Sequence, residues 1–445
     1  MAKTKFVCES CGYETGKWYG KCPECNSWNT LTEVVLEDKK GQYSTFSSKT
    51  SLVPQKIGAI KSIKEKRLYL HFEELNRVMG GSDLPSGGGI VPGSVTLISG
   101  DPGVGKSTLL LQVALFLSQE GKKVLYVTGE ESETQVKMRA ERIMGSEKLQ
   151  KHELFITSTT DIDSVLVLAH SKRPDLLIID SIQTMQTSGL SGFPGSIPQI
   201  RYCTSRLVAL AKREQIPVIM IGHVTKEGMV AGPMLLSHMV DTVLYLEGEL
   251  MTGTRILRSF KNRFGDTSEV GIFIMEEKGM VELKDASLFF TNKNNQSSPG
   301  SCLTVIMEGS RPLLIEIQAL SVPSTLSFPR RVSTGISEKR LELLLAVIQK
   351  HAKISIERMD IFVNVVGGLK IQETASDLAV AMAIISSFKN MALKTSAFIA
   401  EIGLLGELKH VVNLEKRIKE ANKFGAKNVI TAKNAKSLSE AIKLI

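Results

Sequence analysis

The sequence predicts an α/β protein: one large, mostly parallel sheet follows a small cysteine module and precedes a second, smaller α/β or α+β domain. Short β-branched runs alternate with longer amphipathic stretches between residues 57 and 290, which is the pattern of strands and crossover helices. Four of the six cysteines lie within the first 25 residues. A polar, turn-rich break, TNKNNQSSPG, separates the large domain from the C-terminal one.

The length of 445 residues suits about three domains of roughly 150 residues each. We expect, in order, a cysteine module at 1–30, a linker at 31–56, a large α/β domain at 57–290, a linker at 291–300 and a C-terminal domain at 301–445. Hydrophobic residues make up 42% and charged residues 23%, which excludes a disordered chain. No apolar run approaches the roughly 18 residues of a membrane span, so we expect no membrane partner and a cytoplasmic location.

Five apolar runs in the large domain read as strands. Four end beside residues suited to phosphate chemistry. The runs are SVTLIS at 94–99, KVLYVT at 123–128, LLIID at 176–180, PVIMIG at 217–222 and TVLYLEG at 242–248. In the C-terminal domain we expect helices over 338–351 and 375–388.

The net charge of +9 is concentrated at the C-terminal end. Residues 300–445 hold 20 Lys and Arg against 13 Asp and Glu. A basic domain favours a polyanionic partner such as nucleic acid, although a solvated surface would have the same composition.

The N-terminal cysteines form two C-x2-C pairs separated by ten residues, a spacing typical of a structural zinc site. The expected ligands are Cys8, Cys11, Cys22 and Cys25. Four thiolates close the coordination sphere, so the site is structural or recognitional rather than catalytic; unligated thiols or a redox pair are the alternative. Trp18, Tyr19 and Trp28 either pack around the metal or stack on bases or a partner protein.

The segment GDPGVGKST fits G-x4-G-K-[ST] and stands between a strand and an apolar helical run, the setting of a phosphate-binding Walker A loop. Its backbone N–H groups would turn inward around the β-phosphate, Lys106 would reach the β/γ oxygens and Ser107 would ligate Mg²⁺. The nucleotide-binding residues expected here are Gly100, Asp101, Pro102, Gly103, Val104, Gly105, Lys106, Ser107 and Thr108.

Three further strand ends supply the rest of an ATP-hydrolysing site. Asp180, at the end of LLIID, is placed to hold Mg²⁺. Glu130 follows the strand KVLYVT as the favoured base for the attacking water, with Glu131 as the alternative. His223 occupies a γ-phosphate sensor position, or is a core residue.

The segment KNRFG presents Lys261 and Arg263 two residues apart, on one face of an extended chain. Such cations stabilise a transferring phosphoryl group, in their own subunit or in a neighbour. A solvated basic turn would look the same.

The cysteine knuckle, the motifs GDPGVGKST, GEES and KNRFG, and the basic C-terminal domain together resemble the bacterial RadA (Sms) family of DNA repair proteins. The resemblance covers essentially the whole chain and implies a RecA-like P-loop ATPase core. It implies a DNA-dependent ATPase that forms a homo-oligomeric ring, a hexamer, on single-stranded and branched DNA. The ring would promote branch migration alongside RecA, with Lys261 and Arg263 acting in trans or in coupling to DNA.

The C-terminal segments QETASDLAVAMAIIS and EIGLLGELKHVVNLEKRIKEANKFG resemble the Lon-protease domain, which uses a Ser/Lys dyad. The serine position falls at Asp377 and the lysine position at Glu415. Ser376 and Lys416 are each one residue out of register, a rotation of about 100° on a helix, so we expect no productive dyad. The domain is better interpreted as an assembly and DNA-binding surface.

Two Gly-rich loops, at 184–199 and 225–233, resemble the pore loops with which RecA-like rings grip single strands, although ordinary surface loops would look alike. Three classes of function stay open: an ATP-driven DNA motor, which the motifs favour, a non-translocating ATP switch that scaffolds a repair complex, and an ATP-dependent protease.

Overall fold

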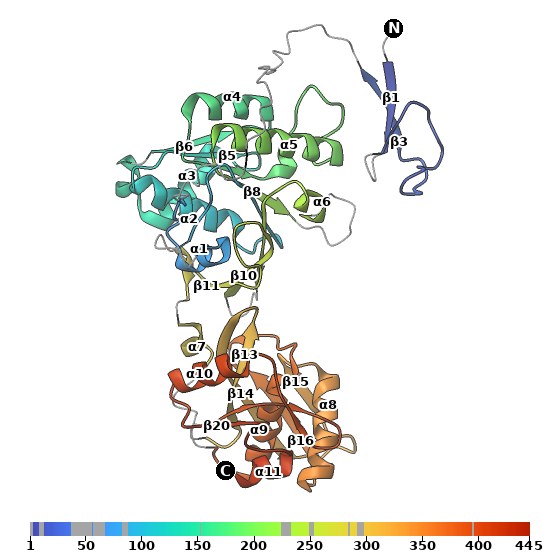
Figure 1. Ribbon diagram of the computed structural model, residues 1–445, viewed down its shortest axis with the longest axis vertical. Coiled ribbons are helices and arrows are strands. Elements are labelled where there is room, and N and C mark those ends of the chain that lie inside the picture. The colour runs from blue at the N-terminus through green and yellow to red at the C-terminus, as the bar shows by residue number, and fades with distance from the viewer. Residues whose placement is uncertain are drawn as a thin grey trace. The chain divides into compact units, whose positions relative to one another are not determined.

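The computed structural model describes residues 3–8, 13–36, 56, 67–81, 88–151, 153–223, 233–248, 253–283, 285–291, 298–393 and 396–445 (Figure 1). The chain divides into two compact units. The first comprises Met1–Gly248, Ile256–Thr267 and Met275–Val281, and the second Glu249–Arg255, Ser268–Ile274 and Glu282–Ile445. The linkers expected at 31–56 and 291–300 lie partly outside the described residues, so the predicted domain boundaries stay predictions.

Within the described residues, the large domain is built on a nine-stranded sheet in the order β12-β11-β10-β9-β4-β8-β7-β5-β6. Its strands are β4 (Val95–Gly100), β5 (Val124–Thr128), β6 (Leu154–Ser158), β7 (Leu176–Asp180), β8 (Val218–His223), β9 (Thr242–Gly248), β10 (Thr254–Asn262), β11 (Val270–Glu276) and β12 (Gly279–Glu282). The pairs β4–β8, β4–β9, β5–β6, β5–β7 and β7–β8 are parallel. This confirms the predicted parallel sheet, and each of the five predicted strands matches to within one residue.

Helices cover both faces of this sheet. The helices α4 (Ile162–Lys172) and α5 (Ile197–Glu214) pack on one face, where their apolar side chains form a buried cluster with residues of β4, β5, β7 and β8. The helix α2 (Lys106–Gln119) is buried along most of its length and contacts β4, β5 and β6, and it also contacts α3 (Glu133–Met144). Two short helices also belong to this part, α1 (Glu73–Met79) and α6 (Pro233–Ser237).

The carboxyl ends of the central strands meet at one edge of the sheet. In the strand register Gly100 lies beside His223, and Thr128 lies beside Asp180. Ligands of open α/β sheets bind outside this edge, because the loops that leave it diverge there. The four segments expected to handle ATP therefore leave the sheet on the same side.

The N-terminal module is a three-stranded antiparallel sheet in the order β2-β1-β3. The strands are β1 (Lys3–Cys8), β2 (Glu14–Thr15) and β3 (Leu31–Leu36). Strand β3 pairs with β1 along its whole length, so residues 31–36, which the sequence pattern assigned to the linker, belong to this sheet.

The C-terminal domain is a six-stranded mixed sheet in the order β15-β16-β14-β13-β17-β20, with a separate hairpin, β18–β19. Its strands are β13 (Ser301–Glu308), β14 (Arg311–Pro323), β15 (Arg331–Thr334), β16 (Met359–Val365), β17 (Ser396–Ile399), β18 (Glu401–Ile402), β19 (Leu408–Lys409) and β20 (Asn428–Thr431). Its helices are α7 (Ala286–Phe289), α8 (Glu338–Val347), α9 (Asp377–Lys389), α10 (Leu414–Lys423) and α11 (Leu438–Lys443).

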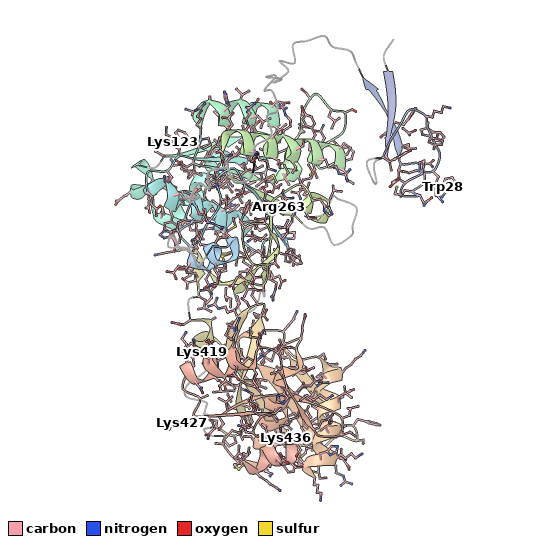
Figure 2. The ribbon with its side chains drawn as sticks, in the orientation of Figure 1. Trp28, Lys123, Arg263, Lys419, Lys427 and Lys436 are labelled. Carbon is pink, nitrogen blue, oxygen red and sulfur yellow. The ribbon has the colours of Figure 1, made fainter. Side chains whose placement is uncertain are left out.

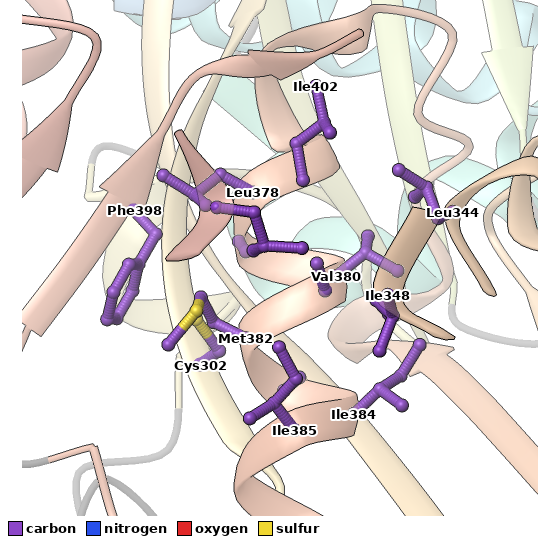
Figure 3. Packing of buried hydrophobic residues seen from close by; sticks show 14 of the residues in the cluster. Cys302, Leu344, Ile348, Leu378, Val380, Met382, Ile384, Ile385, Phe398 and Ile402 are labelled. Carbon is purple, nitrogen blue, oxygen red and sulfur yellow. The ribbon is translucent and has the colours of Figure 1, made fainter. Parts of the chain in front are cut away.

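The core of this domain surrounds α9, whose side chains Leu378, Val380 and Met382 are fully or almost fully buried (Figure 3). Ile348 and Phe398 close around it from the α8 end and from β17. The two predicted helices are present as α8 and α9, with a π-helical turn after α8 and a 3-10 turn before α9. Among the helices that the structure describes, none is long and apolar enough to cross a membrane.

Candidate active site

The predicted phosphate loop connects β4 to the first turn of α2. Asp101, Pro102 and Gly103 are exposed, and Gly103 (φ +75°) has open space where a Cβ would stand. Gly105 adopts the left-handed conformation (φ +111°) at the N-cap of α2, a conformation that glycine reaches without strain. The backbone N–H groups of the first helical turn have no intrahelical partner, so this loop fits a nucleotide phosphate.

Lys106 is the first residue of α2 and is 4% exposed. Its ammonium donates to the carbonyl oxygens of Gly100 at 2.8 Å and Asp101 at 2.9 Å, so it lies across the loop. Burial lowers the pKa of Lys106, and the carboxylates of Asp180, Asp101 and Glu130 oppose that shift. The lysine therefore stands among the predicted site residues, where a phosphate would replace the two carbonyls as its partner.

Asp180 ends β7 and is 4% exposed. One of its oxygens, Oδ2, accepts a hydrogen bond of 2.6 Å from the phenol of Tyr126 on β5. Tyr126 was not among the residues predicted from the sequence. A signal was available, because a buried tyrosine needs a polar partner and the next strand carries an aspartate.

Glu130 lies in the turn after β5, held by two neighbours at the strand ends. Its Oε1 accepts a hydrogen bond of 2.5 Å from the Ser181 hydroxyl. His223 Nε2 lies 3.3 Å from the same oxygen. His223 and Ser181 lower the pKa of Glu130 to about 2 against the opposing effect of burial. A carboxylate with so low a pKa stays ionised and is better suited to orienting a water molecule than to retaining its proton.

Glu131, the alternative to Glu130, has a different partner. Its Oε1 forms an ion pair with Arg139 on α3. The backbone N–H groups of Glu130 and Glu131 both donate to the Thr128 hydroxyl, at 3.3 and 3.0 Å. The turn is thus held by Thr128, with Glu130 beside His223 and Ser181 and Glu131 bound to α3.

The KNRFG segment lies at the amino ends of β4 and β9, opposite the strand ends that carry the phosphate loop. Arg263 Nη1 is 3.0 Å from Asp241 Oδ1, and Asp241 Oδ2 accepts from the Val95 N–H at the start of β4. The Lys261 ammonium donates to the carbonyls of Ser237 at 2.6 Å and Val240 at 2.9 Å. The structure therefore does not bring Lys261 and Arg263 together with the phosphate loop of the same chain, which follows the opposite end of β4.

The turn of KNRFG is packed against the end of α1 and against Gly80, which follows it. Asn262 donates to the carbonyls of Val78 and Met79 at 3.0 and 3.1 Å. A Cβ on Gly265 would lie 2.5 Å from the Cα of Gly80, so this contact requires glycine. Burial lowers the pKa of Lys261, with a smaller contribution from Arg263. These contacts hold the segment in one conformation, in which the Arg263 side chain is 54% exposed.

In the N-terminal module, the Sγ atoms of Cys8, Cys22 and Cys25 lie within 4.8 Å of one another. The Cys8 and Cys25 sulfurs are 3.6 Å apart, close to the about 3.8 Å expected for two thiolates on one tetrahedral Zn²⁺ with bonds of about 2.3 Å. Cys11, the fourth expected ligand, lies outside the described residues. The three described thiols fit Zn²⁺.

Phe6 and Tyr13 pack against the buried Cys8 and Cys22, but three other aromatic residues of this module are exposed. Trp18, Tyr19 and Trp28 are 55%, 44% and 71% exposed, and Figure 2 shows the side chain of Trp28. Gly20 lies between the two indoles, since a Cβ there would lie within 4.0 Å of both. The ammonium of Lys21 stands 5.7 Å from the centre of the Trp28 ring. These residues form an exposed aromatic face.

The first expected pore loop, 184–199, begins in the turn after Asp180 and runs into α5. Gln199, 1% exposed, anchors it: its amide accepts from the Thr187 N–H at 2.9 Å and donates to the carbonyl of Leu190 at 2.7 Å. Phe193 is 69% exposed on the loop. The second expected loop, 225–233, lies almost entirely outside the described residues.

The positions of the Lon dyad carry ion pairs. Asp377 is bound by Arg340, with Arg340 Nε 2.9 Å from Oδ1. Glu415 is exposed and pairs with Lys433. Ser376 is buried, its hydroxyl 3.5 Å from a carbonyl oxygen of the preceding turn, whereas Lys416 is exposed. Among the described residues no contact joins Ser376 to Lys416.

Three family models match separate parts of the chain. An AAA domain matches residues 85–229, a rubredoxin metal-binding domain matches 6–33, and subunit ChlI of Mg-chelatase matches 332–435. Solved structures similar to the chain include an ATPase domain, with a TM-score of 0.38 and 13% identity over 43% of this chain and 85% of that one. The RadB recombinase matches with a TM-score of 0.37 and 23% identity over 49% of this chain and 100% of that one.

The fold and the strand-end residues define a P-loop ATPase with an N-terminal zinc ribbon and a C-terminal α/β domain similar to subunit ChlI of Mg-chelatase. The DNA repair protein RadA of Bacillus subtilis is 45% identical over 437 residues, 97% of this chain and 93% of the relative. RadA of Listeria monocytogenes is 44% identical over 97% and 92% of the two chains, and that of Haemophilus influenzae 44% over 96% and 92%. The chain belongs to the RadA family of DNA repair proteins.

The cofactors of these domains are ATP with Mg²⁺ in the P-loop domain and Zn²⁺ in the ribbon. The phosphate loop, the Ser107 hydroxyl and the Asp180 carboxylate supply the donors and oxygens that Mg²⁺ and a triphosphate need. In the ribbon, the clustered thiols supply the soft ligands that Zn²⁺ prefers.

Proposed function

We propose that this chain is a DNA-dependent ATPase that assembles as a hexameric ring on single-stranded and branched DNA and promotes branch migration together with RecA. The observation that carries the proposal is the meeting of four strand ends at one edge of the sheet, where Lys106, Glu130, Asp180 and His223 face one site. The loop that contains Phe193 leaves the same edge, and this supports coupling of ATP turnover to a strand of DNA.

In this proposal the loop residues 100–108 would bind the triphosphate. The Ser107 hydroxyl and the Asp180 carboxylate would hold Mg²⁺, which would neutralise phosphate charge. Lys106 stabilises the charge of the transferring phosphoryl group. Glu130 orients the attacking water, and His223 and Ser181 hold its carboxylate in place. Because His223 ends β8 and Glu130 follows β5, loss of the γ-phosphate would change contacts at the ends of both strands.

Lys261 and Arg263 complete the site of a neighbouring copy. The distance along the sheet supports this role, since the segment cannot reach its own phosphate loop without losing its contacts with Asp241 and with the end of α1. A site that needs a second copy favours an assembled ring over a monomer. We expect Lys261→Ala or Arg263→Ala to retain nucleotide binding and to lose work on DNA, and unaltered branch migration would make KNRFG a basic turn.

The exposed Phe193 suits stacking on a base, an interaction worth about 1–3 kcal/mol for each base. Phe193→Ala should weaken the stimulation of ATP turnover by single-stranded DNA and leave turnover without DNA unchanged. Phe155→Ala is the control, because Phe155 is a partly exposed phenylalanine on β6 that packs under Lys172, away from the loop. If single-stranded DNA stimulates ATP turnover equally in both variants, the loop does not bind DNA through Phe193.

The zinc ribbon is proposed to recruit a partner, RecA, through its exposed aromatic face. Cys22→Ser should leave ATP hydrolysis largely intact and lose the association in a pull-down with RecA. Trp28→Ala tests the face without touching the metal site. Association that survives both changes would contradict this role, and binding to single-stranded DNA that falls in Trp28→Ala would show that the face stacks on bases.

The C-terminal domain is proposed to be without peptidase activity and to serve assembly and DNA binding. Cleavage of an unfolded protein that disappears in Ser376→Ala would contradict this and restore the protease alternative. Normal assembly and DNA binding without directional movement on branched substrates would favour the scaffold alternative.

The test of the whole proposal is the mass of the assembled species with ATP and single-stranded DNA, measured beside unwinding of a branched DNA. A hexamer that unwinds the substrate, with both ATP turnover and unwinding lost in Lys106→Ala, is the expected result. A monomer that neither assembles nor unwinds would contradict it.

A further inference from the structure

The Tyr126 phenol is enclosed within the sheet and directed at the carboxylate of Asp180. Tyr126 is 0% exposed and its O–H donates to Asp180 Oδ2 at 2.6 Å. Hydrogen bonds to a charged acceptor are shorter and roughly twice as strong as neutral ones. This bond therefore fixes the rotation of the Asp180 side chain as well as its place at the end of β7.

The geometry leaves one oxygen of Asp180 available. In the described part of the chain, Oδ1 accepts no hydrogen bond, whereas Oδ2 is held by Tyr126. Tyr126 pairs in register with Ile178 and Thr128 with Asp180, so the tyrosine reaches forward by two residues to the neighbouring strand end.

We propose that Tyr126 is a positioning residue for the Mg²⁺·ATP complex: it binds Oδ2 of Asp180 and so presents Oδ1 to the metal. The inference rests on the proposed role of Asp180. Residues that orient a metal ligand in this way change metal affinity by about 10- to 100-fold when they are removed. The alternative is that Tyr126 only fills the core beneath α2.

The same strand also holds the water-orienting carboxylate, through a different residue. Thr128 accepts hydrogen bonds from the backbone N–H groups of Glu130 and Glu131, two residues after Tyr126. Strand β5 thus positions the metal-binding group with one side chain and the Glu130 turn with another. The two effects can be separated, because a change at Tyr126 should alter the Mg²⁺ requirement and a change at Thr128 should alter kcat.

The test is Tyr126→Phe, which removes one oxygen and keeps the ring that fills the core. The measurement is binding of a fluorescent ATP analogue as Mg²⁺ is titrated, without turnover, together with Mn²⁺ binding followed by its paramagnetic resonance signal. We expect the Mg²⁺ concentration for half-maximal binding to rise about tenfold, at the lower end of that range, with binding of the analogue in EDTA unchanged. Tyr202→Phe is the matched control, since it removes a phenol oxygen from α5 on the opposite face of the sheet.

Asp180→Asn separates the role of Tyr126 from that of Asp180. If Asp180→Asn raises the Mg²⁺ requirement and Tyr126→Phe behaves as wild type, the positioning role of Tyr126 is wrong and the proposed function stands. If Asp180→Asn itself leaves the Mg²⁺ requirement unchanged, the proposed role of Asp180 is wrong.

Tyr126→Phe alone leaves the buried Asp180 carboxylate without a hydrogen-bond donor and could therefore fail to fold. The double variant Tyr126→Phe with Asp180→Asn avoids this problem, because the asparagine carries no charge. If Tyr126 acts through Asp180, Tyr126→Phe adds nothing to the Mg²⁺ requirement of Asp180→Asn. A further rise in the double variant would overturn the inference.

Discussion

Lys106 and Arg263 lie at opposite ends of the same pair of parallel strands. Lys106 follows the carboxyl end of β4, whereas Arg263 binds Asp241, whose carboxylate accepts from the backbone at the amino end of β4. With six residues in β4 and about 3.3 Å per residue, the two ends are about 17 Å apart. Within one chain, Arg263 is therefore far from the nucleotide that Lys106 would bind.

This separation predicts complementation between two inactive variants. Lys106→Ala and Arg263→Ala should each fail to unwind a branched DNA. Mixed before assembly, they should recover part of the activity, because some interfaces then combine an intact phosphate loop with an intact Arg263 from the neighbour. The measurement is unwinding as a function of the mixing ratio. Mixed assemblies that form but stay inactive at every ratio would show that Arg263 acts within its own subunit.

The second prediction concerns the choice between Glu130 and Glu131. Glu130→Gln should keep nucleotide binding and lower kcat by about 10²-fold, the lower end of the usual range for a side chain that acts on the attacking water, because the amide lacks the charge that orients it. Glu131→Gln is the matched control, because it breaks the ion pair with Arg139 and should lower the melting temperature with little effect on kcat. The reverse order of the two kcat values would assign the role to Glu131.

A third prediction follows from the pKa of about 2 for Glu130. A carboxylate with a pKa of about 2 is ionised throughout the range above about pH 4, so Glu130 should give no acid limb to the kcat profile there. We expect His223→Asn to raise that pKa, since His223 is the largest cause of the shift, and to lower kcat without adding a limb above about pH 5. A wild-type limb that moves when Glu130 is replaced would show that Glu130 titrates much closer to neutrality.

The fourth prediction concerns the lysines of the C-terminal domain. Lys416, Lys419 and Lys423 follow a spacing of three and four residues on α10, so they share one exposed face, and Lys427 follows the end of the helix. Figure 2 shows Lys419 and Lys427 on the same side of the C-terminal domain. Lys423 is 3.7 Å from Asp285, so the other three are the better candidates for binding phosphates.

Replacing Lys416, Lys419 and Lys427 with Ala should weaken DNA binding for all sequences alike. Removing one lysine–phosphate interaction lowers the slope of log K against log salt by about 0.7 for a single strand, so the slope of the triple variant should fall by about 2. The control with the same change of charge is Lys339, Lys350 and Lys353, which are exposed around α8. Equal effects of the two triple variants would mean that only net charge matters.

The sequence was sufficient for the elements whose signal is local. The phosphate loop, the β7 aspartate and the five strands follow from motif and alternation, because a P-loop requires a strand before it and a helix after it. The sequence did not decide whether Trp18 and Trp28 pack around the metal or are exposed for recognition. Composition does not show which face of a small zinc ribbon a tryptophan lies on.

Interactions across the sheet could not be predicted in the same way. The bond from Tyr126 to Asp180 joins residues 54 positions apart and depends on which strands are neighbours. The position of KNRFG at the far edge depends on the return of β10 beside β9, which no local pattern predicts. Residues 31–36 were assigned to a linker because the residues around them are polar. They form strand β3, which pairs with β1 over six residues.

The most direct measurement of the central claim is the steady-state rate of ATP hydrolysis by the full chain with and without single-stranded DNA, with Lys106→Ala as the background. The account predicts a rate that rises with DNA and that is absent from the variant under both conditions. Equal rates with and without DNA would contradict a DNA-driven motor.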